Sequence, residues 1–230
     1  MIRIKENIEY TKNEIKEACN KVGRDPKEVT LIVVSKTIDT NRINIAIEEV
    51  EDIGENKVQE IMDKHQELSP VNIHMIGHLQ TNKVKYIIDK VKLIHSLDRL
   101  SLAKEIDKRA KSHDLIMDTL VQVNVANEST KFGLSCEEVY SFLNEIQSLE
   151  NIRVKGLMTV APFDEDVENV RKYFKRLKEM FEEIKGKNLS NVEMKYLSMG
   201  MTNDYKIAIE EGSNLIRVGT GIFGYRNYTK

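Results

Sequence analysis

Short hydrophobic runs recur along the chain, separated by longer stretches in which apolar residues follow helical spacing. The first run, TLIVV at residues 30–34, is β-branched and uninterrupted, which is typical of a strand buried on both faces of a parallel sheet. Similar runs follow it at regular intervals. We therefore predict strands at residues 30–36, 52–56, 72–78, 92–97, 120–126, 153–160, 194–200 and 214–219.

Amphipathic helices account for the stretches between these runs. The segment from Ile4 to Val22 has apolar residues at intervals of three, four and seven, and it ends near Gly23. This helix precedes the first strand. Further helices are predicted between the strands, at residues 41–50, 56–68, 99–113, 136–149 and 166–187.

Strict alternation of strands and helices favours a parallel sheet, and eight such units close naturally into a (β/α)8 barrel. An open, doubly wound sheet is the alternative. Such a sheet usually carries a GxGxxG turn after its first strand, whereas residues 35–40 read SKTIDT. We predict a single domain, residues 1–230, with the α/β fold of a TIM-type barrel and an extra N-terminal helix.

Composition narrows the class of partner. The formal net charge is -2, so no basic excess favours nucleic acid, and a small-molecule partner is expected. Cys19 and Cys136 show no pairing pattern, and no cysteine or carboxylate cluster joins His74 and His78 in a metal site. No signal peptide or membrane-length apolar run is present. We expect a cytoplasmic, metal-free protein that contacts no membrane.

Functional groups of a barrel gather at the carboxyl ends of its strands, and Lys36 directly follows the first strand. A lysine that enters an apolar barrel loses hydration, which favours the neutral amine, a nucleophile toward an aldehyde. Schiff-base chemistry is the functional interpretation. The alternative is a lysine that simply ends a strand and reaches solvent.

Two loops near the C-terminus have the composition of an anion site. The N–H groups of Gly219 and Thr220 follow the last strand, and Ser198 and Gly200 follow the strand before it. In barrels, phosphate commonly binds at the loops after the last two strands. Alternatively, these glycines merely permit tight turns. Arg217 should project inward, either toward a structural carboxylate or toward a ligand.

Motifs from one end of the chain to the other carry a family resemblance. They read VSK, GENKVQE, HMIGHLQTNK, IHSLD, VQVNVANESTKFG, GLMTVAP, SMGMTND and IRVGTGIFGYR. With them, the sequence resembles the pyridoxal phosphate homeostasis protein family. The resemblance implies a (β/α)8 barrel like the N-terminal domain of alanine racemase, with pyridoxal 5'-phosphate (PLP) joined to Lys36.

The resemblance also implies a set of cofactor-binding residues at the matching positions. Phosphate is expected at Ser198, Gly219 and Thr220, with help from the loop after Ser198, and Arg217 is expected to face the pyridine nitrogen. Two more side chains are expected to line the pocket near the ring. The full set is Lys36, Asn56, Met158, Ser198, Met199, Gly200, Arg217, Gly219 and Thr220.

A further family signature contains His78, Gln80 and Asn82, and the resemblance assigns these three residues no clear role. The chain departs from the family at two positions near the expected phosphate. Thr202 stands where serine is frequent, and Gly221 stands where alanine is common. Both changes preserve small size, so neither challenges cofactor binding.

Physical arguments favour a carrier of PLP over a fast enzyme. A cationic Arg217 beside the pyridine nitrogen disfavours protonation of that nitrogen and weakens the ring as an electron sink. Racemase relatives take a second base, a tyrosine, from an additional β domain of a partner subunit, and this chain ends at Lys230 soon after the last predicted strand. We expect a monomer that buffers PLP or delivers it to PLP-dependent apo-enzymes. A slow racemase, a cofactor-free Schiff-base aldolase and a ligand-free interaction module are the alternatives.

Overall fold

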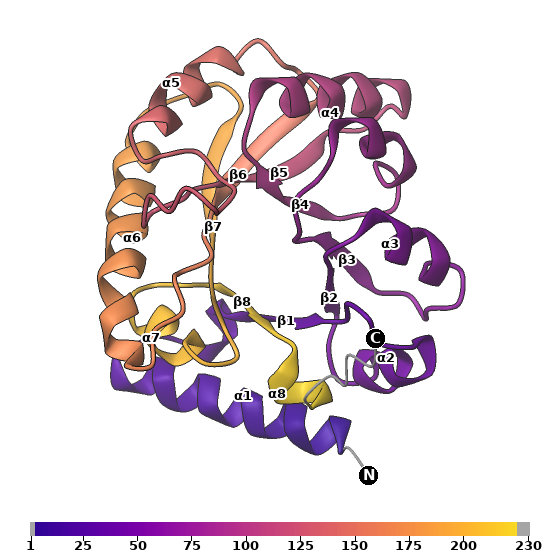
Figure 1. Ribbon diagram of the computed structural model, residues 1–230, viewed down its shortest axis with the longest axis vertical. Coiled ribbons are helices and arrows are strands. Elements are labelled where there is room, and N and C mark those ends of the chain that lie inside the picture. Colours follow the sequence, from indigo (N-terminus) through magenta and orange to yellow (C-terminus); the bar gives the residue numbers. More distant parts are fainter. Residues whose placement is uncertain (1–2, 225–230) are drawn as a thin grey trace.

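Strands form the centre of the molecule, and each one overlaps a predicted hydrophobic run. The computed structural model describes residues 3–224. The strands are β1 (Thr30–Val34), β2 (Asp52–Glu55), β3 (Asn72–Met75), β4 (Leu93–Leu97), β5 (Met117–Gln122), β6 (Ile152–Met158), β7 (Val192–Met201) and β8 (Leu215–Val218). They pair in parallel in chain order, and β8 returns to β1 (Figure 1). The predicted barrel is confirmed, and the open-sheet alternative is wrong.

Helices surround this barrel on its outer face (Figure 1). They are α1 (Ile4–Lys21), α2 (Thr40–Ile47), α3 (Val58–Lys64), α4 (Leu100–Ser112), α5 (Glu138–Glu145), α6 (Arg171–Lys185), α7 (Tyr205–Glu210) and α8 (Thr220–Phe223). Between β3 and β4 the connection is a 3-10 helix, Thr81–Tyr86. Within residues 3–224, no helix has both the length and the apolar composition that a bilayer crossing requires.

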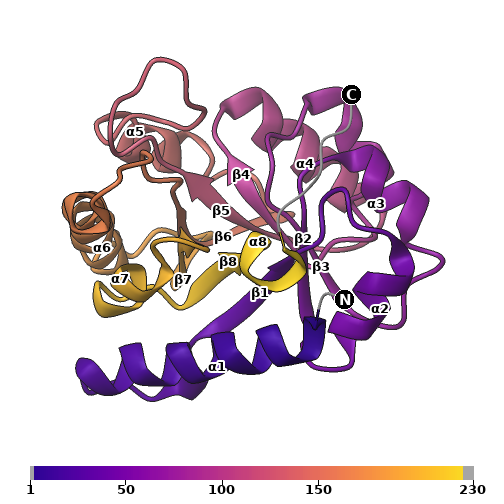
Figure 2. The same ribbon diagram turned by 60° about the horizontal axis from the view of Figure 1, so that its bottom comes forward.

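The extra N-terminal helix packs across one side of the barrel, against α2, α7 and α8 (Figure 2). Its buried face includes Ile4, Ile8 and Ile15, the residues whose spacing predicts the helix. The helix therefore covers the region where the last strand meets the first.

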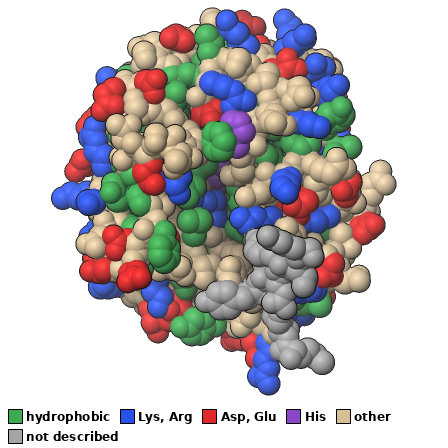
Figure 3. All heavy atoms as spheres, viewed as in Figure 1, with side chains coloured by type: hydrophobic (Ala, Val, Ile, Leu, Met, Phe, Trp, Pro, Cys, Tyr) green, Lys and Arg blue, Asp and Glu red, His purple; other side chains and the backbone are tan. Residues whose placement is uncertain are grey.

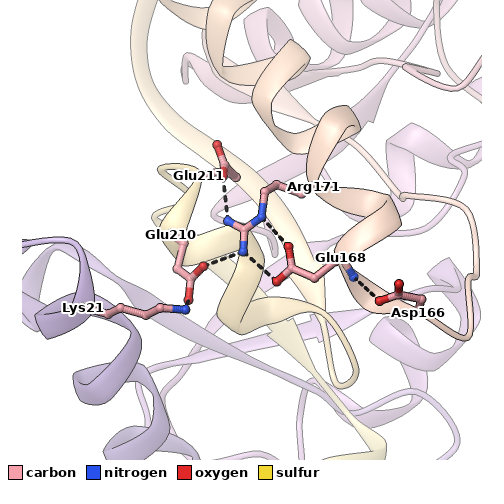
Figure 4. Close-up of polar contacts among 6 residues, drawn as sticks. All are labelled: Lys21, Asp166, Glu168, Arg171, Glu210 and Glu211. Carbon is pink, nitrogen blue, oxygen red and sulfur yellow. Dashed lines mark hydrogen bonds and ion pairs between the residues drawn. The ribbon is translucent and has the colours of Figure 1, made fainter.

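A surface cluster of charged residues ties three helices together next to this contact (Figure 4). Arg171, the first residue of α6, donates to Glu168, Glu210 and Glu211, in each case over 2.7 Å. Lys21 of α1 donates to Glu210 over 2.6 Å. We call these five residues the Arg171 cluster.

The largest departure from the predicted strands is in β5, which begins at Met117 and ends at Gln122, earlier than residues 120–126 suggest. The hydrophobic run continues, but the side chain of Asn124 captures the backbone of Glu128. Its Oδ1 accepts from the Glu128 N–H over 3.1 Å, and its Nδ2 donates to the Glu128 carbonyl over 2.8 Å. An asparagine that satisfies backbone groups in this way competes with strand pairing and forms a turn.

Two hydrophobic clusters stabilise the barrel. The larger one lies between the strands and the helices, and the smaller one fills the barrel interior. The interior cluster consists of Ile32, Leu93, Leu120, Met158 and Leu215. Because these residues alternate with outward-facing ones along their strands, they fix which side chains near the carboxyl ends point inward.

Candidate functional site

A cavity of about 390 Å³ opens at the carboxyl ends of β1, β6, β7 and β8. Four of the predicted cofactor residues line it, namely Lys36, Arg217, Gly219 and Thr220. Figure 3 shows a hollow near the middle of one face, with Lys and Arg side chains among hydrophobic ones. The volume lies in the range of roughly 300–1,000 Å³ that is typical of small-molecule pockets.

Lys36 reaches the cavity because it continues the inward register of β1. Ile32 belongs to the interior cluster, Val34 lines the cavity, and Lys36 is the next residue in that alternation. Its side chain is half-buried. Lys36 thus lines the cavity, as its functional interpretation requires.

The backbone on both sides of Lys36 is held from α3. Thr37 has a φ of +62°, a strained conformation for a β-branched residue. Its N–H donates to a carboxylate oxygen of Glu60 over 2.5 Å, and Lys64 donates to the carbonyl of Ser35 over 3.0 Å. These bonds stabilise the turn that directs Lys36 inward.

Arg217 lies in the barrel interior below the cavity, with 4% of its surface exposed. Its guanidinium donates to the Ser198 hydroxyl over 2.5 Å and to the Thr159 carbonyl over 2.8 Å. Among the described residues no carboxylate forms an ion pair with it, so the alternative of a structural carboxylate partner is wrong. Burial lowers the pKa of Arg217 to about 10, and the charge of Asp204 opposes that shift. A buried cation with neutral partners is well suited to an acceptor in the cavity.

The loops after β7 and β8 supply groups suited to an anion. In residues 3–224, the N–H groups of Gly219 and Thr220 donate to no protein acceptor. Thr202 lines the cavity beside them, and its Oγ1 is 3.4 Å from the N–H of Gly221. Asp204 accepts from the Met201 N–H over 2.5 Å, which closes the β7 loop around the cavity.

Ser198 does not line this cavity, although the family resemblance implies that it contacts the phosphate. The residue is fully buried, and its hydroxyl bonds to Arg217 and, over 3.0 Å, to Nδ1 of His95. The pairing of β7 with β8 shifts register between Ser198 and Met201. Thr202, beyond this shift, lines the cavity, whereas Ser198, before it, lies deeper in the barrel.

The other expected residues also lie away from the cavity wall. Met199 is buried in the outer core, and Gly200, with a φ of +94°, packs against α7, where a Cβ would lie 2.6 Å from the Cβ of Ala208. Met158 belongs to the interior cluster, and Asn56 is half-buried just after β2. None of the four lines the cavity, and their expected contacts with a cofactor stay predictions.

The signature after β3 lies outside the cavity as well. His78 stacks on Phe132 with ring centroids 3.9 Å apart, and its Nδ1 is 3.5 Å from Asp98. Gln80 and Asn82 are exposed at the start of the 3-10 helix. The stacking of His78 on Phe132 joins the loop after β3 to the loop after β5.

Sequence reasoning missed a chain of buried polar residues beneath Arg217. From Ser198, bonds run to His95, from His95 to His74 over 2.9 Å, and from His74 to Asp52 over 2.8 Å. Burial lowers the pKa of both histidines, and for His95 the shift is large. Burial alone raises the pKa of Asp52, but its bonds to His74 and Lys92 outweigh this effect and lower it. We call Asp52, His74, His95 and Ser198 the interior chain.

Comparison with known proteins connects this geometry to a family. The family model described as alanine racemase, N-terminal domain, matches residues 5–227. A relative from Aquifex aeolicus, named pyridoxal phosphate homeostasis protein, is 41% identical over 97% of this chain and 98% of its own length.

Two solved structures share the fold over most of the chain. An unknown protein from Bifidobacterium adolescentis has a TM-score of 0.91 and 31% identity, covering 96% of this chain and 94% of its own. PipY from Synechococcus elongatus, solved with PLP bound, has a TM-score of 0.79 and 28% identity. That match covers 91% of this chain and all of PipY.

Proposed function

This chain belongs to the pyridoxal phosphate homeostasis protein family, and on that premise we propose that its cavity binds PLP and that the protein carries or buffers the cofactor. One observation supports the proposal above the rest. Lys36, Arg217 and the Gly219–Thr220 turn line a single cavity, although Lys36 is far from the others in sequence. The amine is suited to the aldehyde of PLP, the cationic donor to its pyridine nitrogen, and the N–H groups of the turn to its phosphate.

Each group in the cavity has a distinct part in holding the cofactor. Lys36 supplies the amine for a Schiff base with the aldehyde, and Arg217 donates toward the ring nitrogen. The phosphate is held by the N–H groups of Gly219 and Thr220 together with the hydroxyl of Thr202. In this assignment, Thr202 replaces Ser198 as the hydroxyl ligand.

The bound cofactor supplies an aldehyde and a ring that can act as an electron sink. Arg217 limits that use, because a guanidinium only donates and therefore favours an unprotonated ring nitrogen. The carboxylates on the cavity wall are also engaged. Asp204 accepts from the Met201 N–H, and Asp164 accepts from the side chain of Asn169 over 3.1 Å. These features support a holder of PLP rather than an efficient racemase.

Reduction of the PLP-loaded protein with borohydride tests the proposal. We expect visible absorption before reduction and a phosphopyridoxyl group on Lys36 afterwards, located by peptide mass mapping. Lys36→Ala should lose both signals. Lys131→Ala is the matched control, because Lys131 lines the same cavity and has no assigned role. A colourless protein, or a label on Lys131 in place of Lys36, would contradict the proposal.

The same preparation separates the carrier from an enzyme. We expect no racemisation of amino acids above the rate of free PLP, measured by chiral chromatography. Turnover that disappears in Lys36→Ala and persists in Lys131→Ala would instead identify a slow PLP-dependent racemase.

A further inference from the structure

The two ends of the interior chain fix the direction of every hydrogen bond in it. Arg217 can only donate, so the Ser198 oxygen accepts from it and the Ser198 proton points elsewhere. At the other end, an ionised Asp52 can only accept, so Nε2 of His74 carries the proton in that bond. Both ends thus require the same direction of donation, from Arg217 toward Asp52.

The histidines between these ends must adopt one tautomer each. A neutral imidazole has one donor and one acceptor nitrogen, and burial keeps His74 and His95 neutral. Because His74 donates through Nε2, its Nδ1 accepts from Nε2 of His95. Nδ1 of His95 then accepts a hydrogen bond from the Ser198 hydroxyl. Every hydrogen-bond donor in the interior chain thus has an acceptor, and the dipoles of its hydrogen bonds all point in the same direction.

This alignment matters because, in the part of the chain that the structure describes, no carboxylate forms an ion pair with Arg217. Each dipole in the interior chain turns its negative end toward the guanidinium and its positive end toward Asp52. In a buried, low-dielectric setting, such a chain strengthens its own bonds and stabilises the charge at each end. Ser198 thereby stays an acceptor for Arg217 and does not present its proton to the cation.

We propose that Asp52, His74 and His95 are positioning residues of the cofactor site, which act through Ser198 to hold the guanidinium of Arg217 from the opposite end of the barrel. The inference rests on the proposed function, because it concerns how Arg217 meets the ring of PLP. It assigns a role to three residues that do not touch the cavity.

The position of Asp52 makes the inference testable, because it is remote from the cofactor. Asp52 is the first residue of β2 and lies at the amino ends of the strands, beside a small cavity that Lys92 and Asp118 also line. Asp118 accepts from Arg153 over 2.8 Å and, within residues 3–224, has no hydrogen bond to the interior chain. The two aspartates thus occupy the same end of the barrel, and only Asp52 is connected to Arg217.

Replacement of Asp52 should alter PLP binding from this distance. Asp52→Leu removes the terminal acceptor, so His74 and His95 can exchange tautomers and Ser198 loses its fixed orientation. We expect PLP to dissociate at least tenfold faster and its visible band to shift. Asp118→Leu is the matched control and should stay within twofold of the unmodified protein. Asp52→Asn should restore slow dissociation, because its side-chain carbonyl still accepts from His74.

Nitrogen NMR of the histidine rings tests the direction of the hydrogen bonds in the interior chain and does not need the cofactor. In the full-length protein we expect His74 and His95 to be neutral and protonated at Nε2, and Asp52→Asn to retain that state. Protonation at Nδ1 of His95, or identical PLP dissociation and spectra for Asp52→Leu and Asp118→Leu, would overturn the inference. If borohydride reduction of the unmodified protein leaves no phosphopyridoxyl group on Lys36, the proposed function is overturned instead. The histidine tautomers would still show whether the hydrogen bonds of the interior chain all run in one direction.

Discussion

Arg171 and Arg217 each organise a group of hydrogen bonds, but their partners differ in charge. Arg171 lies at the surface and bonds three carboxylates, whereas Arg217 lies in the barrel and bonds a hydroxyl and a carbonyl. Hydrogen bonds from Arg171 to the carboxylates raise its pKa, while burial lowers that of Arg217 to about 10. A cation saturated by carboxylates stabilises the fold. A buried cation without one, beside a cavity, is available to a ligand.

The largest effect should follow from removal of the buried arginine. Arg217→Met keeps an unbranched apolar stem but removes the donor that we propose for the ring nitrogen. A charge-assisted hydrogen bond contributes about 1.5–3 kcal/mol, so we expect PLP affinity to fall roughly 100-fold in equilibrium titration. Arg217→Lys should not rescue binding, because an ammonium cannot reproduce the planar fork. Unchanged PLP affinity in Arg217→Met would contradict the role of Arg217 in ligand binding that the comparison with Arg171 assigns to it.

The next effect is a difference in pH dependence between the two regions. The pKa values of His74 and His95 are lowered by burial from 6.5, so the unfolded chain binds protons below about pH 6.5 that the folded chain does not. Stability is therefore complete above pH 6.5 and falls as the pH drops. Each histidine contributes about 1.4 kcal/mol per pH unit, so we expect a loss of about 2–3 kcal/mol between pH 7.5 and 5.5 in urea unfolding.

Variants can assign that loss to the barrel interior. His95→Gln should remove about half of the pH dependence, and His113→Gln, at an exposed position, should leave it unchanged. The Arg171 cluster affects stability in a lower pH range. Hydrogen bonds from Arg171 lower the pKa of Glu168 from 4.5, so its stabilisation is present above about pH 4.5 and is lost as the pH falls through the folded value. Equal stability at pH 7.5 and 5.5 would refute the buried-neutral assignment.

A smaller effect is expected at the surface. Arg171→Met removes three ion pairs from a side chain that is 30% exposed, which should cost about 1–2 kcal/mol of unfolding free energy. PLP affinity should not change. Arg109→Met, which breaks one helical pair with Glu105, is the control and should cost less than about 0.5 kcal/mol. Weaker PLP binding in Arg171→Met would show that the two regions are coupled.

The fold could be predicted from sequence because its pattern is local. Strands buried on both faces must be apolar runs, and helices that cover them must be amphipathic, so both leave a continuous signal. The same logic extends to the inward side chains of regular strands, and it places Lys36 and Arg217 correctly. Family motifs supply the chemistry that we propose for these two residues.

The rest of the site depends on offsets between strands, which no single segment encodes. The pairing of β7 with β8 shifts register between Ser198 and Met201, and Thr202, beyond that shift, lines the cavity whereas Ser198, before it, does not. The contact of His74 with His95 likewise depends on how β3 and β4 are staggered. Sequence alone shows two histidines in neighbouring strands, and only the paired strands reveal that they form a chain to Arg217.

The smallest and most selective effect should separate the two hydroxyls. If Thr202 binds phosphate, Thr202→Val should weaken PLP about tenfold and leave binding of pyridoxal, which has no phosphate, nearly unchanged. Ser198→Ala should weaken both ligands by a similar factor, because Ser198 acts through Arg217 on the ring that they share. Competition titrations with the two ligands measure each ratio directly. The reverse pattern, with Ser198→Ala selective for the phosphate, would restore the role that the family resemblance implies for Ser198 and would detach the interior chain from the cofactor.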